Sequence, residues 1–137
     1  MMRKNISGGS PFEPLIGFSR AVRVGNAVYL SGTGPVGADD LDAAGQTRRI
    51  FAIANDALTQ AGSSLDHVFR TRMYLTRAED WEAVGRVHGE IFSKVQPAAT
   101  MVVVAELLNP AWRVEIEMDA IIPDSETIPE SGTETAK

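Results

Sequence analysis

Cysteine is missing from this sequence, so disulfide bonds, thiolate nucleophiles and cysteine-liganded metal sites are all excluded. No apolar run approaches the ~18 residues that a membrane-spanning helix needs. Positive charge is also scarce: 13 Lys and Arg stand against 18 Asp and Glu, which gives a net charge of −5. Surfaces that bind nucleic acid need clustered Lys and Arg, so this balance argues against a nucleic-acid-binding protein.

The two ends of the chain have little apolar content. Residues 1–10 carry positive charge but lack the apolar segment that follows it in a secretory signal, so we expect a soluble cytoplasmic protein. Residues 123–137 are mostly Ser, Thr, Glu and Pro, which bury too little surface to offset the entropy of ordering. We therefore expect a disordered tail there and a single domain with its own core over residues 1–122.

The first third of the sequence predicts a β-hairpin. Two apolar, β-branched runs, residues 21–24 and 27–31, are separated by Gly25-Asn26, and a two-residue glycine turn of this kind joins hairpin strands. Residues 1–6 are compatible with an additional edge strand. Residues 7–17 hold three glycines and two prolines and therefore predict a loop.

Two longer stretches predict helices. Apolar residues recur at intervals of three and four in residues 39–62 and again in residues 78–95, so each helix would present one apolar face. Gly62 is a suitable end for the first helix, and Pro97 prevents the second from continuing.

Three further stretches predict strands. Residues 68–75 alternate, with Val68, Arg70, Arg72 and Tyr74 expected on one face. Residues 100–107 have an unbroken apolar centre, which is typical of a strand buried on both faces. Residues 113–122 alternate again, with apolar side chains on one face and, on the other, charged side chains: Arg113, Glu115, Glu117 and Asp119.

The three carboxylates of this last strand have two interpretations. Residues two apart on a strand share a face and lie roughly 6.5–7 Å apart, so Glu115, Glu117 and Asp119 form a row. The row is either a solvated face of the sheet or the source of a general acid or base in a pocket.

The order of these elements is hairpin, helix, strand, helix and two strands. This order predicts an α/β sandwich, an α+β arrangement in which two helices pack on one face of a mixed sheet. Two helices leave the other face of the sheet uncovered, whereas the apolar residues 101–104 are expected to be buried on both faces. Because uncovered apolar sheet faces are usually interfaces, we expect a homo-oligomer with a small-molecule pocket at the seam between subunits.

Three segments, in order, resemble the RidA/YjgF family: FSRAVRVGNAVYLSGTGPV, LTQAGSSLDHVFRTRMYLT and PAATMVVVAELLNPAWRVEIEMDAI. The resemblance spans roughly residues 11–122. It implies a chorismate-mutase-like fold and a homotrimer with its sheets inside and ligand clefts between subunits. The best-studied branch hydrolyses enamine and imine intermediates to 2-oxo acids and ammonia. The resemblance implies no metal and no organic cofactor.

The resemblance also assigns site residues. It places the water-positioning glutamate at Glu117, the small-residue strand end at Ser31-Gly32 and a cleft tyrosine at the position of Phe18. The family's arginine, which binds the substrate carboxylate, follows a proline and a small residue and precedes a small polar one. This chain reads Pro97-Ala98-Ala99-Thr100, with Ala99 in the arginine's place.

A guanidinium holds a carboxylate through two charge-assisted hydrogen bonds, so its loss predicts that amino-acid-derived imines are not the best ligands of this cleft. Arg72, from another strand, either replaces the missing arginine or forms an ion pair with Glu115 or Glu117. Three functions follow as hypotheses. The first is hydrolysis of a small imine, enamine or related compound through Glu117 and water. The second is a trimer that binds a small ligand without turnover, and the weakest is endoribonuclease-like activity.

Overall fold

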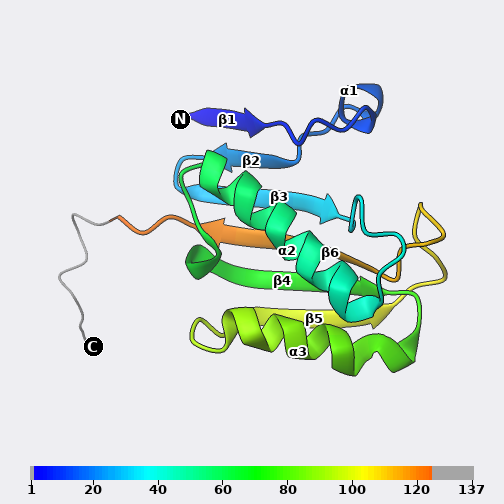
Figure 1. Ribbon diagram of the computed structural model, residues 1–137. Helices are drawn as coiled ribbons and strands as arrows, with labels where there is room; N and C mark the ends of the chain where they lie inside the picture. The colour runs from blue at the N-terminus through cyan, green and yellow to red at the C-terminus, as the bar shows by residue number, and fades with distance from the viewer. Residues whose placement is uncertain (1, 125–137) are drawn as a thin grey trace.

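A six-stranded mixed sheet forms one layer of the molecule in the computed structural model, which describes residues 2–124 (Figure 1). The strand order is β1-β2-β3-β6-β4-β5, and every neighbouring pair is antiparallel except β4 and β5, which are parallel. The strands are β1 (Arg3–Ile6), β2 (Ala21–Val24), β3 (Ala27–Thr33), β4 (Val68–Leu75), β5 (Ala98–Val103) and β6 (Val114–Ile121).

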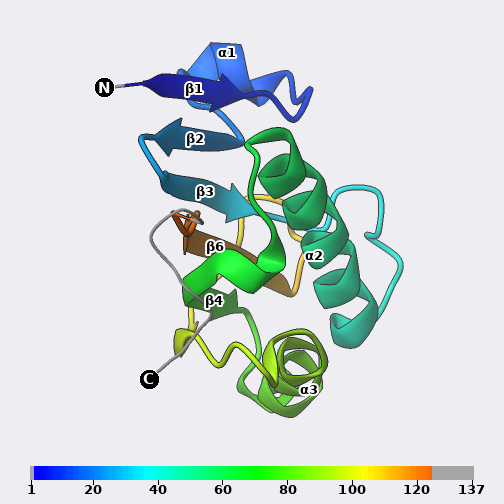
Figure 2. The same cartoon turned by 90° about the vertical axis from the view of Figure 1, so that its left-hand side faces the viewer.

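Helices form the second layer. The two long helices, α2 (Ala43–Gln60) and α3 (Trp81–Phe92), lie on the same side of the sheet, and the side view shows the other side without a helix (Figure 2). Short 3-10 turns, Leu65–His67 and Ala78–Asp80, precede β4 and α3. The α/β sandwich with two helices on one face is thus confirmed, as are the hairpin and the extra edge strand β1.

Helix α2 begins later than the pattern of its apolar residues predicted. Asp42 is its N-cap, and the side chain of Asp42 accepts a hydrogen bond from the Gly45 N–H at 2.9 Å. The helix buries a stripe of side chains that includes Ile50, Ala54 and Leu58 against the sheet. It ends as expected before Gly62, whose φ of +84° is a backbone conformation that glycine adopts easily.

The core lies between the helices and the sheet. Every second residue of β6 enters it, and Val114, Ile116, Met118 and Ala120 are almost completely buried. Each large apolar side chain removed from water in this way contributes about 1.5–3 kcal/mol to folding. This burial fixes the register of β6 and therefore turns Glu115, Glu117 and Asp119 toward the side without helices.

The prediction of a loop over residues 7–17 was wrong in part, because α1 (Phe12–Ile16) forms within it. The buried Glu13 organises this segment: its carboxylate accepts hydrogen bonds from the backbone N–H groups of Gly8 and Ser10. A side chain therefore supplies the local order that glycine and proline content alone does not indicate.

The prediction of a doubly buried strand over residues 100–107 was also wrong for the single chain. Strand β5 begins at Ala98, ends at Val103 and lies at the edge of the sheet, next to β4 alone. As a result Val102 and Val103 are 42% and 55% exposed. An unbroken apolar run indicates that a strand is buried on both faces. It does not indicate whether the same chain or another chain buries it.

A bulge interrupts the alternation of β4. The register against β6 shifts between Val68 and Arg70, so Val68 enters the core and Phe69 is exposed, the reverse of the predicted faces. From Arg70 onward the alternation is as predicted. The tail expected over residues 123–137 falls, from residue 125, outside the described residues.

Candidate functional site

The candidate site is a polar cluster on the side of the sheet that faces away from α2 and α3. Strand β6 contributes Glu115, Glu117 and Asp119, because its apolar residues occupy the core side. Strand β4 lies beside it in a register that pairs Arg72 with Glu117 and Tyr74 with Glu115. Residues paired across two strands share a face, so all five side chains lie on the open side.

Glu117 is held by two neighbours from β4. The hydroxyl of Tyr74 donates a short hydrogen bond to Oε1 of Glu117, and Nη1 of Arg72 lies 3.6 Å from Oε2. The same Arg72 nitrogen lies 3.3 Å from Oδ2 of Asp119. The hydrogen bond to Glu117 is the main reason that the pKa of Tyr74 is raised, with burial as the second cause. The expected pairing of Arg72 with Glu117 is therefore present, and Asp119 takes the place suggested for Glu115.

Glu115 lies in a different environment, over a bulge in β3. The register pairs Leu30 with Met118 and Thr33 with Ile116, so Ser31 and Gly32 together lie opposite one residue of β6. The Glu115 carboxylate occupies the space that a Cβ on Gly32 would fill. Any side chain at this position would therefore displace the carboxylate.

The environment of Glu115 favours its protonated form. Burial is the largest effect and raises the pKa of the carboxyl, the charge of Arg20 lowers it, and the charge of Glu117 raises it again. The net direction is upward. Two neighbouring carboxylates thus differ: Glu117 is fixed by a hydroxyl and a guanidinium, whereas Glu115 is desolvated.

Phe18 and Arg20 border the cluster on the side of β2. The guanidinium carbon of Arg20 lies 5.3 Å from the centre of the Phe18 ring, within the range of a cation–π contact. The backbone carbonyl of Arg20 accepts a hydrogen bond from the Ser31 N–H at 2.9 Å, so Arg20 is adjacent to the bulge. Phe18 thus contacts the arginine whose charge acts on Glu115.

The remaining predicted residues lie on β5, two strands away from β6. Thr100 accepts a hydrogen bond from Nη2 of Arg70 at 2.8 Å and pairs with Arg72 in the register, so it shares the open side with the cluster. Ala99 pairs with Thr71, whose hydroxyl contacts His88 of α3, so Ala99 lies on the helix side. The single chain therefore brings Glu117, Arg72, Ser31 and Gly32 together, leaves Thr100 at the margin and separates Ala99 from them.

Sequence reasoning missed Arg20 and Tyr74 as members of the site. Tyr74 was detectable, because the alternation of β4 already placed it on the face of Arg72. Arg20 gave a weaker signal: it lies only two residues after Phe18, but nothing in the sequence shows that a bulge brings it close to Glu115.

Two surface hollows lie elsewhere. One, of about 450 Å³, lies between α2 and α3 and is lined by charged residues that pair with one another, Arg48 with Glu90 and Arg86 with Glu82. The other, of about 360 Å³, adjoins Pro97 and Phe69. Among residues 2–124, no group of three or more His, Asp or Glu side chains is arranged to hold a metal ion. No helix in that part of the chain could cross a membrane.

Comparison with known proteins decides the family. Residues 9–122 match the family model described as endoribonuclease L-PSP. The chain belongs to the YjgF/RidA family. A Mycobacterium tuberculosis protein, described as a member of the highly conserved YjgF/YER057c/UK114 family, has a similar crystal structure, with a TM-score of 0.83 and 44% sequence identity. The match covers 88% of this chain and 100% of that one, and the fold is the chorismate-mutase-like fold of the family.

Two other proteins are similar to this chain in sequence. An uncharacterised protein of Streptomyces coelicolor is 36% identical over 121 residues, which are 85% of this chain and 90% of that protein. The 3-aminoacrylate deaminase RutC of Acinetobacter baylyi is 33% identical over 113 residues, which are 79% of this chain and 88% of that protein. The family therefore includes a relative named for the deamination of an enamine.

Proposed function

We propose that this chain hydrolyses a small imine or enamine at the polar cluster on the open side of its sheet. The observation that carries the proposal is the difference between Glu115 and Glu117, two carboxylates on one strand face with unlike surroundings. Two titratable groups whose environments differ in this way are suited to opposite roles in acid–base catalysis.

Glu117 accepts the proton of a water molecule, whose oxygen forms a bond to the imine carbon. The electron pair of the C=N double bond moves to nitrogen, which takes a proton from Glu115. The C–N bond of the resulting carbinolamine then breaks, and nitrogen leaves as ammonia with the proton that Glu117 had taken from water. The hydroxyl proton of the carbinolamine passes to a carboxylate as the carbonyl forms. An enamine enters this sequence after its carbon takes up a proton to give the imine.

The exposure of Gly32 supports this assignment, because a small substrate can approach the neighbouring Glu115 from solvent there. The name of the Acinetobacter baylyi relative also supports it, since a 3-aminoacrylate deaminase acts on an enamine. Positioned acid and base groups contribute about 10²–10⁴-fold to a rate each, which is sufficient for a reaction that already proceeds slowly in water.

Enzymatic hydrolysis can be measured with 2-aminoacrylate generated in situ from serine by a serine dehydratase, with pyruvate and ammonia as the products. We expect this chain to accelerate their release, and Glu117→Gln and Glu115→Gln each to lower the rate by about 10²-fold or more. Glu90→Gln is the matched control, because Glu90 is exposed on α3 and pairs with Arg48 on the far side of the sheet. A rate no higher than the spontaneous one would eliminate this function.

The working form in this proposal is a homotrimer whose neighbouring copies cover the open side of the sheet. The exposed apolar side chains there support it: Tyr29 pairs with Asp119 and Val102 with Tyr74, so both share the face of the cluster. Sedimentation should give three times the mass of the chain, and Val102→Lys should shift the species toward the monomer. A wild-type monomer at micromolar concentration would contradict the proposal.

A second candidate is a trimer that binds a small ligand without turnover. The observation in its favour is that Tyr74 and Arg72 already engage both oxygens of Glu117, which leaves this carboxylate fewer free positions for water. A ligand that raises the melting temperature and is recovered unchanged would support it, and turnover of 2-aminoacrylate would rule it out.

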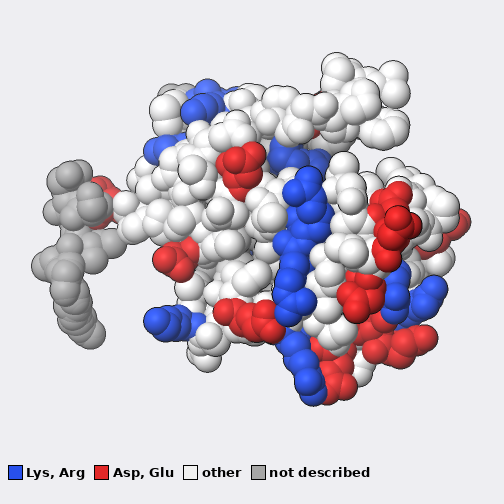
Figure 3. Space-filling model, in the orientation of Figure 1, with Lys and Arg blue, Asp and Glu red and all other residues white. Residues whose placement is uncertain are grey.

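The description of the family model makes RNA cleavage a third candidate, and charge argues against it. The net charge is −5, and the helix side shows a line of basic side chains flanked by acidic ones rather than a broad basic surface (Figure 3). Comparison of wild type with Glu117→Ala on an RNA substrate distinguishes cleavage by this chain from contamination, since only the former would depend on Glu117.

A further inference from the structure

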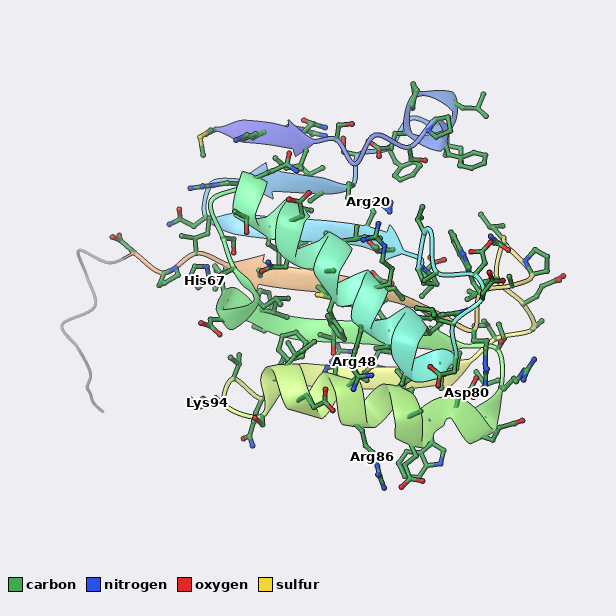
Figure 4. All side chains as sticks on the ribbon, in the orientation of Figure 1. Arg20, Arg48, His67, Asp80, Arg86 and Lys94 are labelled. Atoms are coloured by element: carbon green, nitrogen blue, oxygen red, sulfur yellow. The ribbon has the colours of Figure 1, made fainter. Side chains whose placement is uncertain are left out.

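Arg20 has fewer hydrogen-bond and ion-pair partners for its guanidinium than Arg70 and Arg72, the other arginines near the cluster. It lies directly before β2, at the end of the sheet where β3 bulges (Figure 4). Its Nε is the one buried side-chain nitrogen or oxygen between residues 2 and 124 that lacks a hydrogen-bond partner. A buried donor without a partner is unfavourable, so an acceptor that reached it would form a favourable hydrogen bond.

The charge of Arg20 is also incompletely neutralised. Glu13 and Glu115 interact with it electrostatically, but neither is among the ion pairs within 4.0 Å in the described part of the chain. Burial lowers the pKa of Arg20, and the two carboxylates raise it. Arginine nevertheless remains protonated at neutral pH. The Phe18 ring lies against the guanidinium.

We propose that Arg20 binds the carboxylate of a small substrate beside Gly32, in a subsite formed by the guanidinium, the Phe18 ring and the exposed backbone of the β3 bulge. This inference deepens the proposed function, on which it rests for the identity of the substrate as a 2-imino acid. It assigns to Arg20 the carboxylate binding for which Ala99 has no charged group.

Arg72 is less suited to this role. Its Nη1 lies within 3.6 Å of Glu117 and within 3.3 Å of Asp119, so two carboxylates already neutralise it. A substrate carboxylate at Arg72 would meet both of them. At Arg20 it would meet Glu13, whose oxygens already accept hydrogen bonds from backbone N–H groups, and Glu115, which burial inclines to protonation. Arg70 is engaged with Thr100 at the margin of the cluster.

Binding at Arg20 has a consequence for Glu115. The groups whose charge bears on Glu115 are Arg20 next to β2, Glu117 on the same strand and Tyr74 on β4. A bound carboxylate offsets the charge of Arg20, which is the one influence among these that lowers the pKa of Glu115. Binding should therefore draw a proton onto Glu115, and affinity should rise as the pH falls.

The test uses pyruvate, which carries the carboxylate, and pyruvamide, which has the same shape without the charge. Calorimetry should show that wild type binds pyruvate more tightly than pyruvamide, and that Arg20→Gln weakens pyruvate binding by about 10-fold or more while pyruvamide is unaffected. Arg20→Lys should restore part of the loss, because it keeps the charge but not the two-pronged geometry. Circular dichroism confirms that each variant is folded.

Arg23→Gln is the matched control. Arg23 lies on β2, three residues further along the chain than Arg20, but it points to the helix side, where it donates to the carbonyls of Gly25 and Ala61. The Arg23→Gln variant should bind pyruvate with the affinity of wild type. Equal pyruvate affinity in wild type and Arg20→Gln, equal losses for pyruvate and pyruvamide, or no pyruvate binding by wild type at tens of millimolar would each overturn the assignment.

Proton uptake provides a readout that a merely structural role would not change. Titrations in buffers with different ionisation enthalpies should show uptake on pyruvate binding in wild type and none in Glu115→Gln. Failure of the two proposals can be told apart. Turnover of 2-aminoacrylate with an unchanged KM in Arg20→Gln would refute the role of Arg20 but not the hydrolase function. Charge-dependent pyruvate binding without any turnover of 2-aminoacrylate would refute the hydrolase function but support carboxylate binding by Arg20.

Discussion

The Glu115 carboxylate lies where a side chain on Gly32 would have to lie. The bulge of Ser31 and Gly32 in β3 creates this contact, because two residues there occupy the space opposite one residue of β6. The glycine thus keeps an acidic group close to the sheet, partly out of water, at the end of the polar cluster nearest the β3 bulge.

Gly32→Ala should therefore impair function without unfolding the protein. The added methyl group overlaps Glu115 Oε2, and the flexible carboxylate must swing away. We expect kcat/KM for 2-aminoacrylate to fall by about 10–100-fold, as for other displacements of a catalytic group by about 1 Å. The free energy of unfolding should change by no more than about 1 kcal/mol.

Gly89→Ala on α3 is the control for this variant. A Cβ at Gly89 has nothing within 4 Å, so the substitution should leave activity unchanged and stabilise the helix by about 0.5–1 kcal/mol. Equal activity of Gly32→Ala and wild type would show that the position of Glu115 does not matter for turnover.

The hydrogen bond from Tyr74 to Glu117 can be followed by titration of the phenol. Because the bond requires the protonated hydroxyl, it raises the pKa of Tyr74 above its usual value near 10. In a Tyr29→Phe background, Tyr74 is the sole remaining tyrosine. Ultraviolet absorbance should show its ionisation above pH 10, and Glu117→Gln should move the transition to lower pH. An unmoved transition would mean that the two groups do not interact in solution.

Asp80 and Arg113 form the most enclosed ion pair of the described chain, joining the turn before α3 to the start of β6. Two hydrogen bonds, of 2.6 and 3.0 Å, connect the guanidinium to the buried carboxylate, and the first cause of the raised pKa of Arg113 is this contact. Asp80→Ala should lower the free energy of unfolding by about 3 kcal/mol, toward the lower end for buried pairs because Arg113 is partly exposed. Urea denaturation measures this loss.

Glu82→Ala provides the comparison. Glu82 pairs with Arg86 one helical turn away on the exposed face of α3, so its loss should cost about 0.5 kcal/mol or less. Similar costs for Asp80→Ala and Glu82→Ala would contradict the assignment of Asp80 as a buried structural anchor.

The alternation of β6 was predictable from sequence, and so was the row of carboxylates that depends on it. A strand whose apolar residues recur every second position has only one way to bury them, which fixes the face of Glu117. Helices α2 and α3 followed from their apolar stripes for the same reason.

The bulges could not be predicted, and the candidate site depends on one of them. A bulge adds one residue to one strand without changing the apolar pattern, so the sequence does not show that Gly32 and Glu115 meet or that Phe69 faces outward. The side of β5 that carries Ala99 depends on its register with β4, which is a long-range pairing. Arg20 enters the site because of such a pairing as well, through the hydrogen bond from Ser31 to its carbonyl.

Glu115→Gln should stabilise the protein at neutral pH, in contrast to most substitutions of partly buried groups. Burial raises the pKa of Glu115 in the folded state above its value near 4.3 in the unfolded chain. The folded state then binds this proton more tightly than the unfolded state. The stabilisation from the proton is complete below pH 4.3 and is lost as the pH rises through the folded pKa.

Glutamine imitates the protonated carboxyl at every pH. The free energy of unfolding of Glu115→Gln, minus that of wild type, should therefore increase from pH 4 upward and level off above the folded pKa. Urea denaturation over pH 4–8 measures this difference. In an Arg20→Gln background the increase should extend to higher pH, because the charge of Arg20 lowers the pKa of Glu115. A difference that stays constant over this range would show that Glu115 is solvated in the folded protein.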